Sequence, residues 1–311
     1  MKFKKFLLTG LASFLLLLAV CLPVRYYNQK KPINSPISDI LQITSVWSKN
    51  RGLVWQPQTQ PDNLATEKIK ILAQSGLVIN LSKNKITYAK QANQVMPIAS
   101  LTKIMTALVA LESIPLKQKM VVSYQAAQIG EATMSLEAGE KLTLEELLYG
   151  LMLVSGNDAA FVIAENTAGR APLFINLMNE KAKILNLRKT EFYNPHGLDQ
   201  DNSPHNQSTA YELAILAKYV LDKFPILEKI VATENITINN SSDHKKYSLS
   251  NNLGPRKTYP GLVGIKPGYT EAAGYCLVGL VEKNEEKILV VLLNTPNLKK
   301  DLTSLLDYWL E

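Results

Sequence analysis

The chain has 311 residues, of which 46% are hydrophobic and 20% are charged, and its formal net charge is +7. Such a chain can fold into one large globular domain or two small ones, and its composition excludes a disordered or fibrous protein. The positive charge is not concentrated in a basic run with interleaved aromatic residues, so nucleic-acid binding is not predicted. An ordinary basic soluble protein and one held near an anionic wall or membrane both fit this charge.

The cysteine and histidine residues indicate neither a disulfide nor a metal centre. Cys21 lies in an apolar N-terminal run and Cys276 in a later strand-like segment, which does not suggest a structural pair. His196, His205 and His244 lack the spacing of metal ligands. We therefore expect no metal and no cofactor.

The N-terminus has the pattern of an export signal. Residues 1–5 include three lysines, and the mostly apolar residues 6–24 that follow would span roughly 28 Å as a helix, just enough to cross a bilayer. No small-x-small cleavage site follows, and Val20 is too large for a lipoprotein signal ending at Cys21. Residues 1–24 are predicted to be a signal peptide or, preferably, an uncleaved membrane anchor. In either case the rest of the protein is exported.

Residues 25–65 are predicted to be a linker or tether. They contain several prolines among many Asn, Gln and Ser residues, and their apolar pattern is weak. The remaining segment, 66–311, is predicted to be one domain.

Within that domain the elements change character along the chain. A β-hairpin is predicted over 75–81 and 85–89, a helix over 97–112, and a second helix from the capping box of Thr143 and Glu146 to about Val154. Further helices are expected over 158–168, 172–186 and 208–222, strands over 262–266, 274–281 and 287–293, and a last helix over 302–310. Strands at both chain ends around a helical middle predict an α+β fold with one sheet that both ends supply.

The helix over 97–112 contains a notable pair of polar residues. It is apolar on nearly every side, which is typical of a helix buried in a domain, yet Ser100 and Lys103 share one of its faces. A buried lysine tends to lose its proton, and a neutral lysine beside a serine is a base beside a nucleophile. Because Ser-x-x-Lys is very common, a surface helix with a capping serine and a solvated lysine is the alternative.

Two later motifs decide between these interpretations. Ser155-Gly156-Asn157 and Lys266-Pro267-Gly268 follow in that order. Each alone could be an ordinary loop, helix cap or basic turn. The ordered set of three is typical of penicillin-binding proteins and class A β-lactamases.

Longer runs strengthen this resemblance. The segments PIASLTKIMTALVALE, GEKLTLEELLYGLMLVSGNDAA, NPHGLD, STAYELAILAKY, YPGLVGIKPGYT and AGYCLVGL closely resemble the low-molecular-mass D-alanyl-D-alanine carboxypeptidases of peptidase family S11, over residues 70–310. The resemblance implies a serine β-lactamase/transpeptidase-like fold, with an antiparallel sheet packed against a helical cluster. It also implies hydrolysis of peptidoglycan stem peptides that end in D-Ala-D-Ala, and inhibition by β-lactam antibiotics.

The chemistry of such an acyl transfer assigns a role to each motif residue. Ser100 is the expected nucleophile, Lys103 its base, and the Ser155 hydroxyl the route of the proton to the leaving nitrogen. Asn157 and Lys266 are expected to hold the substrate, and Gly268 lets the strand approach it. By resemblance, the backbone N–H groups of Ser100 and Tyr269 form the oxyanion hole.

Pro267 departs from the family pattern, which has threonine or serine there to bind the substrate's terminal carboxylate. Thr270 could partly substitute. We expect weakened carboxylate recognition, with reduced carboxypeptidase turnover or a preference for D,D-endopeptidase action on cross-links.

Two further alternatives remain. A catalytically weak peptidoglycan-binding protein is one. The other is a class A-like β-lactamase, in which Glu191 would be the candidate to activate the deacylating water, although we interpret Glu191 as a solvent-facing strand residue. His196 is expected to be a structural hydrogen-bonding residue and Cys276 a buried small one.

Overall fold

The computed structural model describes residues 44, 47, 54–57, 69–199, 201, 203–254 and 259–310. The predicted signal segment, 1–24, lies outside these residues, as does most of the predicted tether. Within the described ranges, no helix combines the length and the apolar character that a membrane crossing requires. Two tryptophans of the tether region are described, and both contact lysines of the helical part. The Lys181 ammonium lies 5.0 Å from the centre of the Trp47 ring, and the Lys218 ammonium lies 5.6 Å from that of Trp55.

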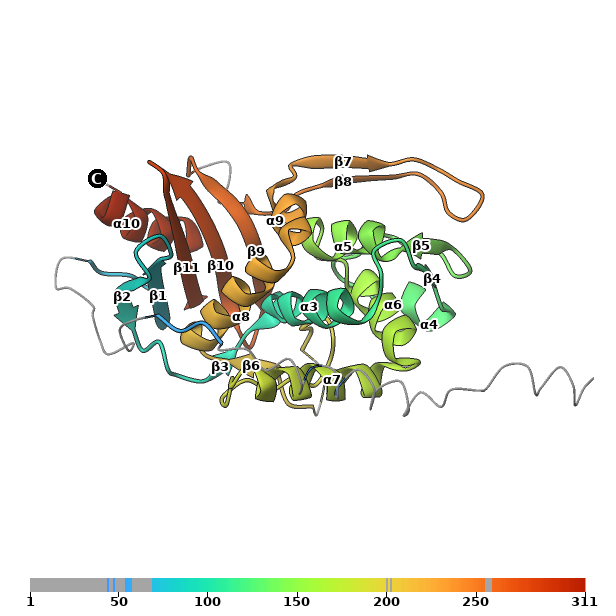
Figure 1. The fold of residues 1–311 in the computed structure, drawn as a ribbon, viewed down its shortest axis with the longest axis horizontal. Helices are drawn as coiled ribbons and strands as arrows, with labels where there is room; N and C mark the ends of the chain where they lie inside the picture. Colours follow the sequence, from blue (N-terminus) through green and yellow to red (C-terminus); the bar gives the residue numbers. More distant parts are fainter. Residues whose placement is uncertain are drawn as a thin grey trace, which may run out of the picture. The chain divides into compact units, whose positions relative to one another are not determined.

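A five-stranded antiparallel sheet combines the two ends of the domain (Figure 1). Its strands are β1 (Ser75–Asn80), β2 (Lys85–Lys90), β9 (Leu262–Thr270), β10 (Gly274–Lys283) and β11 (Glu286–Thr295). Their order is β2-β1-β11-β10-β9, so the N-terminal hairpin joins the C-terminal strands through the β1–β11 pair. This confirms the predicted sheet, with β2 and β9 as its edges.

The central strands are covered on both faces. Every second residue of β11 packs into one apolar cluster with α10 (Leu298–Leu310). The alternate residues of β11 point to the opposite face, where α8 (Ala210–Lys223) packs. The carboxylate of Asp301 in α10 accepts hydrogen bonds from the backbone N–H groups of Leu72 and Ala73 at 2.8 and 2.7 Å. The last helix therefore fixes the chain just before the first strand.

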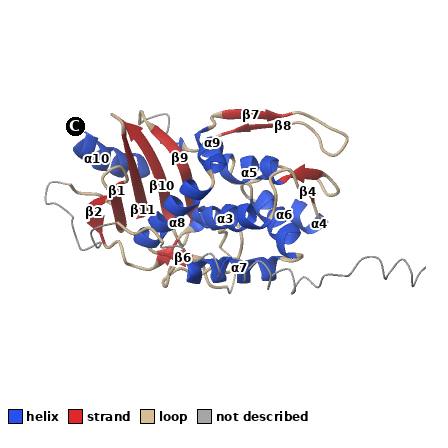
Figure 2. Ribbon diagram, viewed as in Figure 1, coloured by secondary structure: helices blue, strands red, loops and turns tan. Residues whose placement is uncertain are grey.

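The helices other than α10 gather around α3 (Lys103–Ser113), beside the sheet (Figure 2). They are α4 (Tyr124–Ala127), α5 (Leu144–Leu153), α6 (Asn157–Ala168), α7 (Ala171–Ile184), α8 and α9 (Pro225–Ala232). The predicted capping box of α5 is confirmed, because Thr143 and Glu146 exchange side-chain-to-backbone hydrogen bonds. All residues from Lys103 to Ala110 are buried, as the apolar pattern on every side of this helix predicted.

The predicted start of that helix is wrong. Met96–Pro97 is a short strand, β3, and Ala99–Thr102 forms a 3₁₀ turn, η1, before α3 begins at Lys103. The reason is local, since Ala99 has a φ of +46°, which a continuous right-handed helix cannot contain. Ser100 therefore lies in a tight turn ahead of α3.

The remaining differences from the predicted elements are three pairs of short strands and the length of β9. Short strands pair as β3 with β6 (Gln207–Ser208), β4 (Lys119–Val121) with β5 (Lys141–Thr143), and β7 (Asn235–Ile238) with β8 (Tyr247–Ser250). They are too short to carry a periodic pattern. Strand β9 continues to Thr270, so the Lys266-Pro267-Gly268 motif lies inside an edge strand.

Candidate active site

Ser100 lies where the turn η1 meets the edge strand β9. A Cβ placed on Gly268 would lie only 3.0 Å from the backbone nitrogen of Ser100, so a glycine there favours the close approach of the two backbones. The first N–H groups of a helical segment lack partners within it, and they stabilise a negative charge that lies close to them. The Ser100 side chain is half-buried beside this strand.

Lys103 is fully buried, and three oxygens surround its ammonium nitrogen. Nζ lies 3.0 Å from Ser100 Oγ, 2.7 Å from Asn157 Oδ1 and 2.7 Å from the carbonyl oxygen of His196. The two carbonyl oxygens can only accept hydrogen bonds. A neutral amine has two hydrogens and one lone pair, so both hydrogens are committed to these acceptors. The lone pair then faces the Ser100 hydroxyl.

The surroundings of Lys103 favour this neutral form. Burial and, next, the nearby charge of Lys266 hold the pKa of Lys103 well below its usual value, while Asp158 and Glu131 act weakly in the opposite direction. Burial also lowers the pKa of Lys266 to about 7. The arrangement therefore supplies a base next to Ser100 and a cation that can lose its proton near neutral pH.

Ser155 brings a second hydroxyl to the nucleophile. Its Oγ lies 3.1 Å from Ser100 Oγ, and its side chain is almost fully buried after the end of α5. Ser155 has a φ of +61°, in the left-handed region that non-glycine residues rarely adopt. Ala99, which precedes Ser100, has the same unusual conformation. Backbone strain thus lies at or next to both hydroxyl-bearing residues.

Asn157 is fixed at both ends of its amide. Oδ1 accepts from Lys103, and Nδ2 donates to the carbonyl oxygen of Gly130 at 3.0 Å. The next residue, Asp158, accepts hydrogen bonds from the backbone of Met134 and Leu136 at 2.9 to 3.0 Å. The first turn of α6 therefore orders the 130–136 loop beside the site, a role that the sequence motif did not reveal.

The predicted substrate-binding residues lie along β9. Lys266 is fully buried and donates to the Pro267 carbonyl oxygen at 3.1 Å. Tyr269 is exposed, and its ring packs at a tilt against that of Tyr275, with centroids 4.6 Å apart. The Thr270 hydroxyl accepts a hydrogen bond from the backbone N–H of Ala273 in the turn to β10.

The loop of residues 194–198 is the part of the site that the sequence analysis missed. The backbone carbonyl of His196, not its ring, contacts Lys103. Burial and the neighbouring Lys103 lower the pKa of His196 to about 3, and its Nδ1 accepts from the backbone of Leu198, which fits the structural role expected for the ring. The NPHGLD run indicated this loop. The contact between its backbone carbonyl and Lys103 could not be predicted, because every residue has such a carbonyl.

Asn206 connects this loop to the turn that carries the nucleophile. Its Nδ2 donates to Thr102 Oγ1 and to the Asn194 carbonyl oxygen, both at 2.9 Å, and its backbone carbonyl accepts from Ile98. Gly197 has a φ of +90°, and a Cβ there would lie 2.0 Å from the Ala99 carbonyl oxygen. The loop and the turn are thus packed backbone to backbone.

Two other residues considered from the sequence are Glu191 and Cys276, and Cys276 lies opposite Gly268 in the β9–β10 pair. Glu191 is exposed and exchanges two backbone hydrogen bonds with Gln207, as expected of a solvent-facing strand residue. Cys276 is fully buried, as predicted. Within the described part of the chain, no group of three or more His, Cys, Asp or Glu residues could hold a metal ion.

Comparisons with known proteins indicate a family for this chain. Residues 61–297 match the family model of the S11 peptidases, described as D-alanyl-D-alanine carboxypeptidase. A D-alanyl-D-alanine carboxypeptidase (DacF) of Bacillus subtilis is 35% identical over 79% of this chain and 64% of its own length. A D-alanyl-D-alanine endopeptidase of Escherichia coli is 30% identical over 72% of this chain and 72% of its own length. This chain therefore spans about two thirds of the length of such relatives.

The fold is also that of solved members of this group. The DD-transpeptidase of Streptomyces K15 superposes with a TM-score of 0.71 at 28% identity, covering 78% of this chain and 98% of that one. A D-alanyl-D-alanine carboxypeptidase of Mycobacterium tuberculosis gives 0.72 at 26% identity, with 82% and 95% covered. The predicted fold class is confirmed.

Substituting Gly197 tests the backbone contact under Ser100. In Gly197→Ala the new methyl group collides with the Ala99 carbonyl, so the loop or the turn must move. We expect benzylpenicillin to acylate Ser100 about 100-fold more slowly, the cost of a displacement near 1 Å. Gly139→Ala is the matched control, because Gly139 has a φ of +92° but its Cβ would meet no atom within 4 Å. Equal acylation rates in the two variants would contradict the assignment.

Proposed function

The chain belongs to the peptidase S11 family, and we propose that it is a serine D-alanyl-D-alanine carboxypeptidase. Its substrates are peptidoglycan stem peptides ending in D-Ala-D-Ala, and β-lactam antibiotics inhibit it by acylating Ser100. The observation that carries the proposal is the set of contacts around Lys103, which leaves the lone pair of a neutral amine facing Ser100 Oγ.

The first half-reaction forms an acyl-enzyme. Lys103 takes the Ser100 proton while Oγ attacks the carbonyl carbon of the penultimate D-alanine. The ammonium that results has three hydrogens for the same three oxygens, so the site solvates both protonation states of Lys103. The backbone N–H groups of Ser100 and Tyr269 are the proposed donors to the oxyanion.

The leaving group then departs with a proton. The Ser155 hydroxyl, 3.1 Å from Ser100 Oγ, can accept a proton from one side and donate one to the leaving nitrogen. The C–N bond breaks and terminal D-alanine is released. Water then attacks the Ser100 ester, which releases the shortened peptide and restores the hydroxyl.

The residues of β9 and α6 hold the substrate in this scheme. Lys266 supplies positive charge toward the terminal carboxylate, and Gly268, Tyr269 and Thr270 present the strand edge along which a peptide can lie. Asn157 has a second amide hydrogen beyond the one that it gives to Gly130, which can hold the substrate backbone.

The site favours this proposal over its rivals. Glu191 is exposed and paired with Gln207, so it does not supply the deacylating carboxylate that a class A β-lactamase needs. A protein that only bound peptidoglycan would have no use for a fully buried lysine next to two serine hydroxyls.

Acylation by penicillin separates these functions. The full chain and its Ser100→Ala variant are incubated in detergent with benzylpenicillin and followed by intact mass. We expect one lasting penicilloyl adduct on the wild type alone, because Glu191, the carboxylate considered for activating a deacylating water, is a solvent-facing strand residue. An adduct that disappears as penicillin is consumed would indicate a β-lactamase, and the absence of any adduct would indicate a binding protein.

The pH dependence of acylation should report the two buried lysines. Lys103 acts when neutral and Lys266 when charged, so the rate should rise with pH through the lowered pKa of Lys103 and fall through that of Lys266, about 7. In Lys266→Gln the falling limb should disappear. The rising limb should move to higher pH, because the charge that helps to lower the pKa of Lys103 is gone.

A matched control is Lys283→Gln, which removes an exposed lysine from the neighbouring strand β10 and should leave both limbs in place. The rates are measured with a fluorescent penicillin between pH 4 and 10. A rising limb that does not move in Lys266→Gln would refute the proposed coupling between the two lysines.

We also propose that the protein works at the outer face of the cell membrane, held by residues 1–24. The support is the basic start followed by a long apolar run without a cleavage site. We expect the full chain to stay with membranes through an alkaline wash and to be released by detergent. Deletion of 1–24 should leave the chain in the cytoplasm, and a full chain that is recovered free in the medium would argue for cleavage instead.

A further inference from the structure

Two walls of the active site pack separately against the turn η1. The loop of residues 194–198 reaches it through Gly197, on which a Cβ would lie 2.0 Å from the Ala99 carbonyl oxygen. Strand β9 reaches it through Gly268, on which a Cβ would lie 3.0 Å from the Ser100 nitrogen. Both walls therefore touch the backbone on which the nucleophile stands.

Each wall supplies a different part of the proposed chemistry. The loop places the His196 carbonyl oxygen 2.7 Å from the amine of Lys103, and so helps to direct the base. The strand carries Tyr269, whose backbone N–H is a proposed donor to the oxyanion. Base and oxyanion donor must act on one carbonyl group of the substrate, so the position of one wall relative to the other matters for the rate.

Asp199 joins these two walls directly. Its Oδ2 accepts a hydrogen bond at 3.1 Å from the backbone N–H of Ala272, in the turn between β9 and β10. Asp199 lies three residues after His196, and Ala272 lies three residues after Tyr269. The bond thus closes a ring of contacts that runs from the turn η1 through the loop and the strand and back to the turn.

The carboxylate of Asp199 is held at its other oxygen as well. Oδ1 lies 3.1 Å from Nδ1 of His205. The next residue, Asn206, bonds to Thr102 Oγ1 in the turn η1 and to the Asn194 carbonyl oxygen in the loop. One end of the connection is therefore anchored to the segment that already fixes the loop on the turn.

The far end of the connection is anchored too. Ala273, which follows Ala272, is fully buried, and its backbone N–H donates to Thr270 Oγ1 at 3.2 Å. Thr270 pairs with Gly274 across the β9–β10 ladder. A pull on the Ala272 N–H is thereby transmitted to the end of β9 and not absorbed by a loose turn.

A fold-stabilising role alone does not require this bond. The side chain of Asp199 is 33% exposed and that of His205 is 42% exposed, so water can solvate both groups if the bond is broken. Replacing Asp199 buries no unpaired charge, and substitutions at such surface positions usually change stability little. An effect on the reaction can therefore be separated from an effect on folding.

We propose that Asp199 is a positioning residue, which fixes the oxyanion-hole end of β9 relative to the loop that directs Lys103. The inference rests on the proposed function. The oxyanion forms only as the carbonyl group is attacked, so a displaced Tyr269 N–H costs rate and not substrate binding. Because acylation and deacylation both pass through an oxyanion at the same donor, both steps should slow together.

The experiment measures D-alanine release from a tripeptide ending in D-Ala-D-Ala by the full chain in detergent. In Asp199→Ala we expect kcat to fall about tenfold, which corresponds to roughly 1.4 kcal/mol, with KM unchanged. Asp199→Asn keeps an oxygen that accepts from Ala272 but lacks the charge. A neutral hydrogen bond is about half as strong as a charge-assisted one, so its kcat should fall only about threefold.

Asp201→Ala is the matched control, because it removes an exposed carboxylate two residues further along the chain and should leave kcat and KM unchanged. Thermal unfolding of every variant is recorded. An unchanged kcat in Asp199→Ala, with or without a lower unfolding temperature, would overturn the inference. So would a rise in KM alone, or an Asp199→Asn variant as slow as Asp199→Ala.

Acylation by benzylpenicillin is followed by intact mass in the same samples. A wild type that is acylated, together with an unchanged kcat in Asp199→Ala, rejects the positioning role alone. A wild type that neither forms an adduct nor releases D-alanine rejects the proposed function as well.

Discussion

The whole site depends on the burial of one amine among three oxygens. Lys103 Nζ contacts Ser100 Oγ, Asn157 Oδ1 and the His196 carbonyl, which belong to the turn η1, the helix α6 and the loop of residues 194–198. Burial makes the neutral form favourable, and the two carbonyl oxygens direct its lone pair. Each of the three segments must therefore be correctly placed before the lysine can act as a base. The networks of Asn206 and Asp158, which are almost fully buried, provide that placement.

The sheet places the other wall of the site. Because β1 pairs with β11, the N-terminal hairpin and the three C-terminal strands form one layer, and β9 becomes the edge that faces the helices. An edge strand has backbone groups on one side that no neighbouring strand uses, which suits it to hold an extended peptide. Gly268 lets that edge reach the backbone of Ser100, and Asp301 ties the last helix to the chain before β1.

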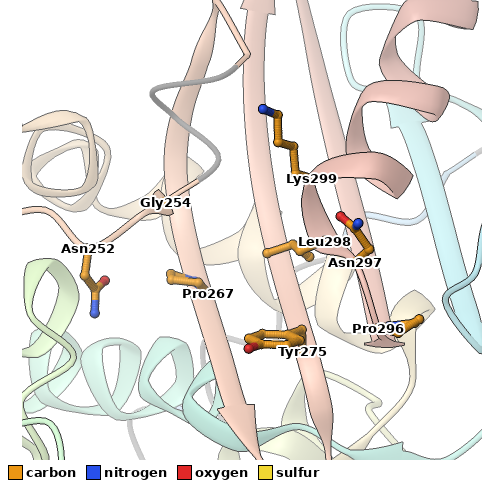
Figure 3. A pocket seen from close by; sticks show the side chains of 8 residues that line it. All are labelled: Asn252, Gly254, Pro267, Tyr275, Pro296, Asn297, Leu298 and Lys299. Carbon is orange, nitrogen blue, oxygen red and sulfur yellow. The ribbon is translucent and has the colours of Figure 1, made fainter.

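The edge position of β9 explains why this strand can contain Pro267, and a groove lies beside that residue (Figure 3). Proline donates no hydrogen bond to a sheet, so an edge position is among the few that it can occupy in a strand. Its ring, with Tyr275 across the β9–β10 pair, forms the apolar wall of this groove, whose lining also includes the cation Lys299. The loss of a hydroxyl from the motif and the presence of this groove are thus features of one surface.

The amino-acid sequence was sufficient to predict the α+β class, the sheet that both chain ends supply, the buried character of α3 and the identity of the residues that meet at Ser100. These features follow from local periodicity, capping residues and ordered motifs. The other features of the site depend on tertiary contacts. Examples are the break of the helix at Ala99, the contact of the His196 carbonyl with Lys103 and the hydrogen bonds of Asn206. These features depend on backbone conformations and on carbonyl groups that every residue has, so residue types do not predict them. The groove beside Pro267 gathers residues from 252 to 299, and only the folded chain brings them together.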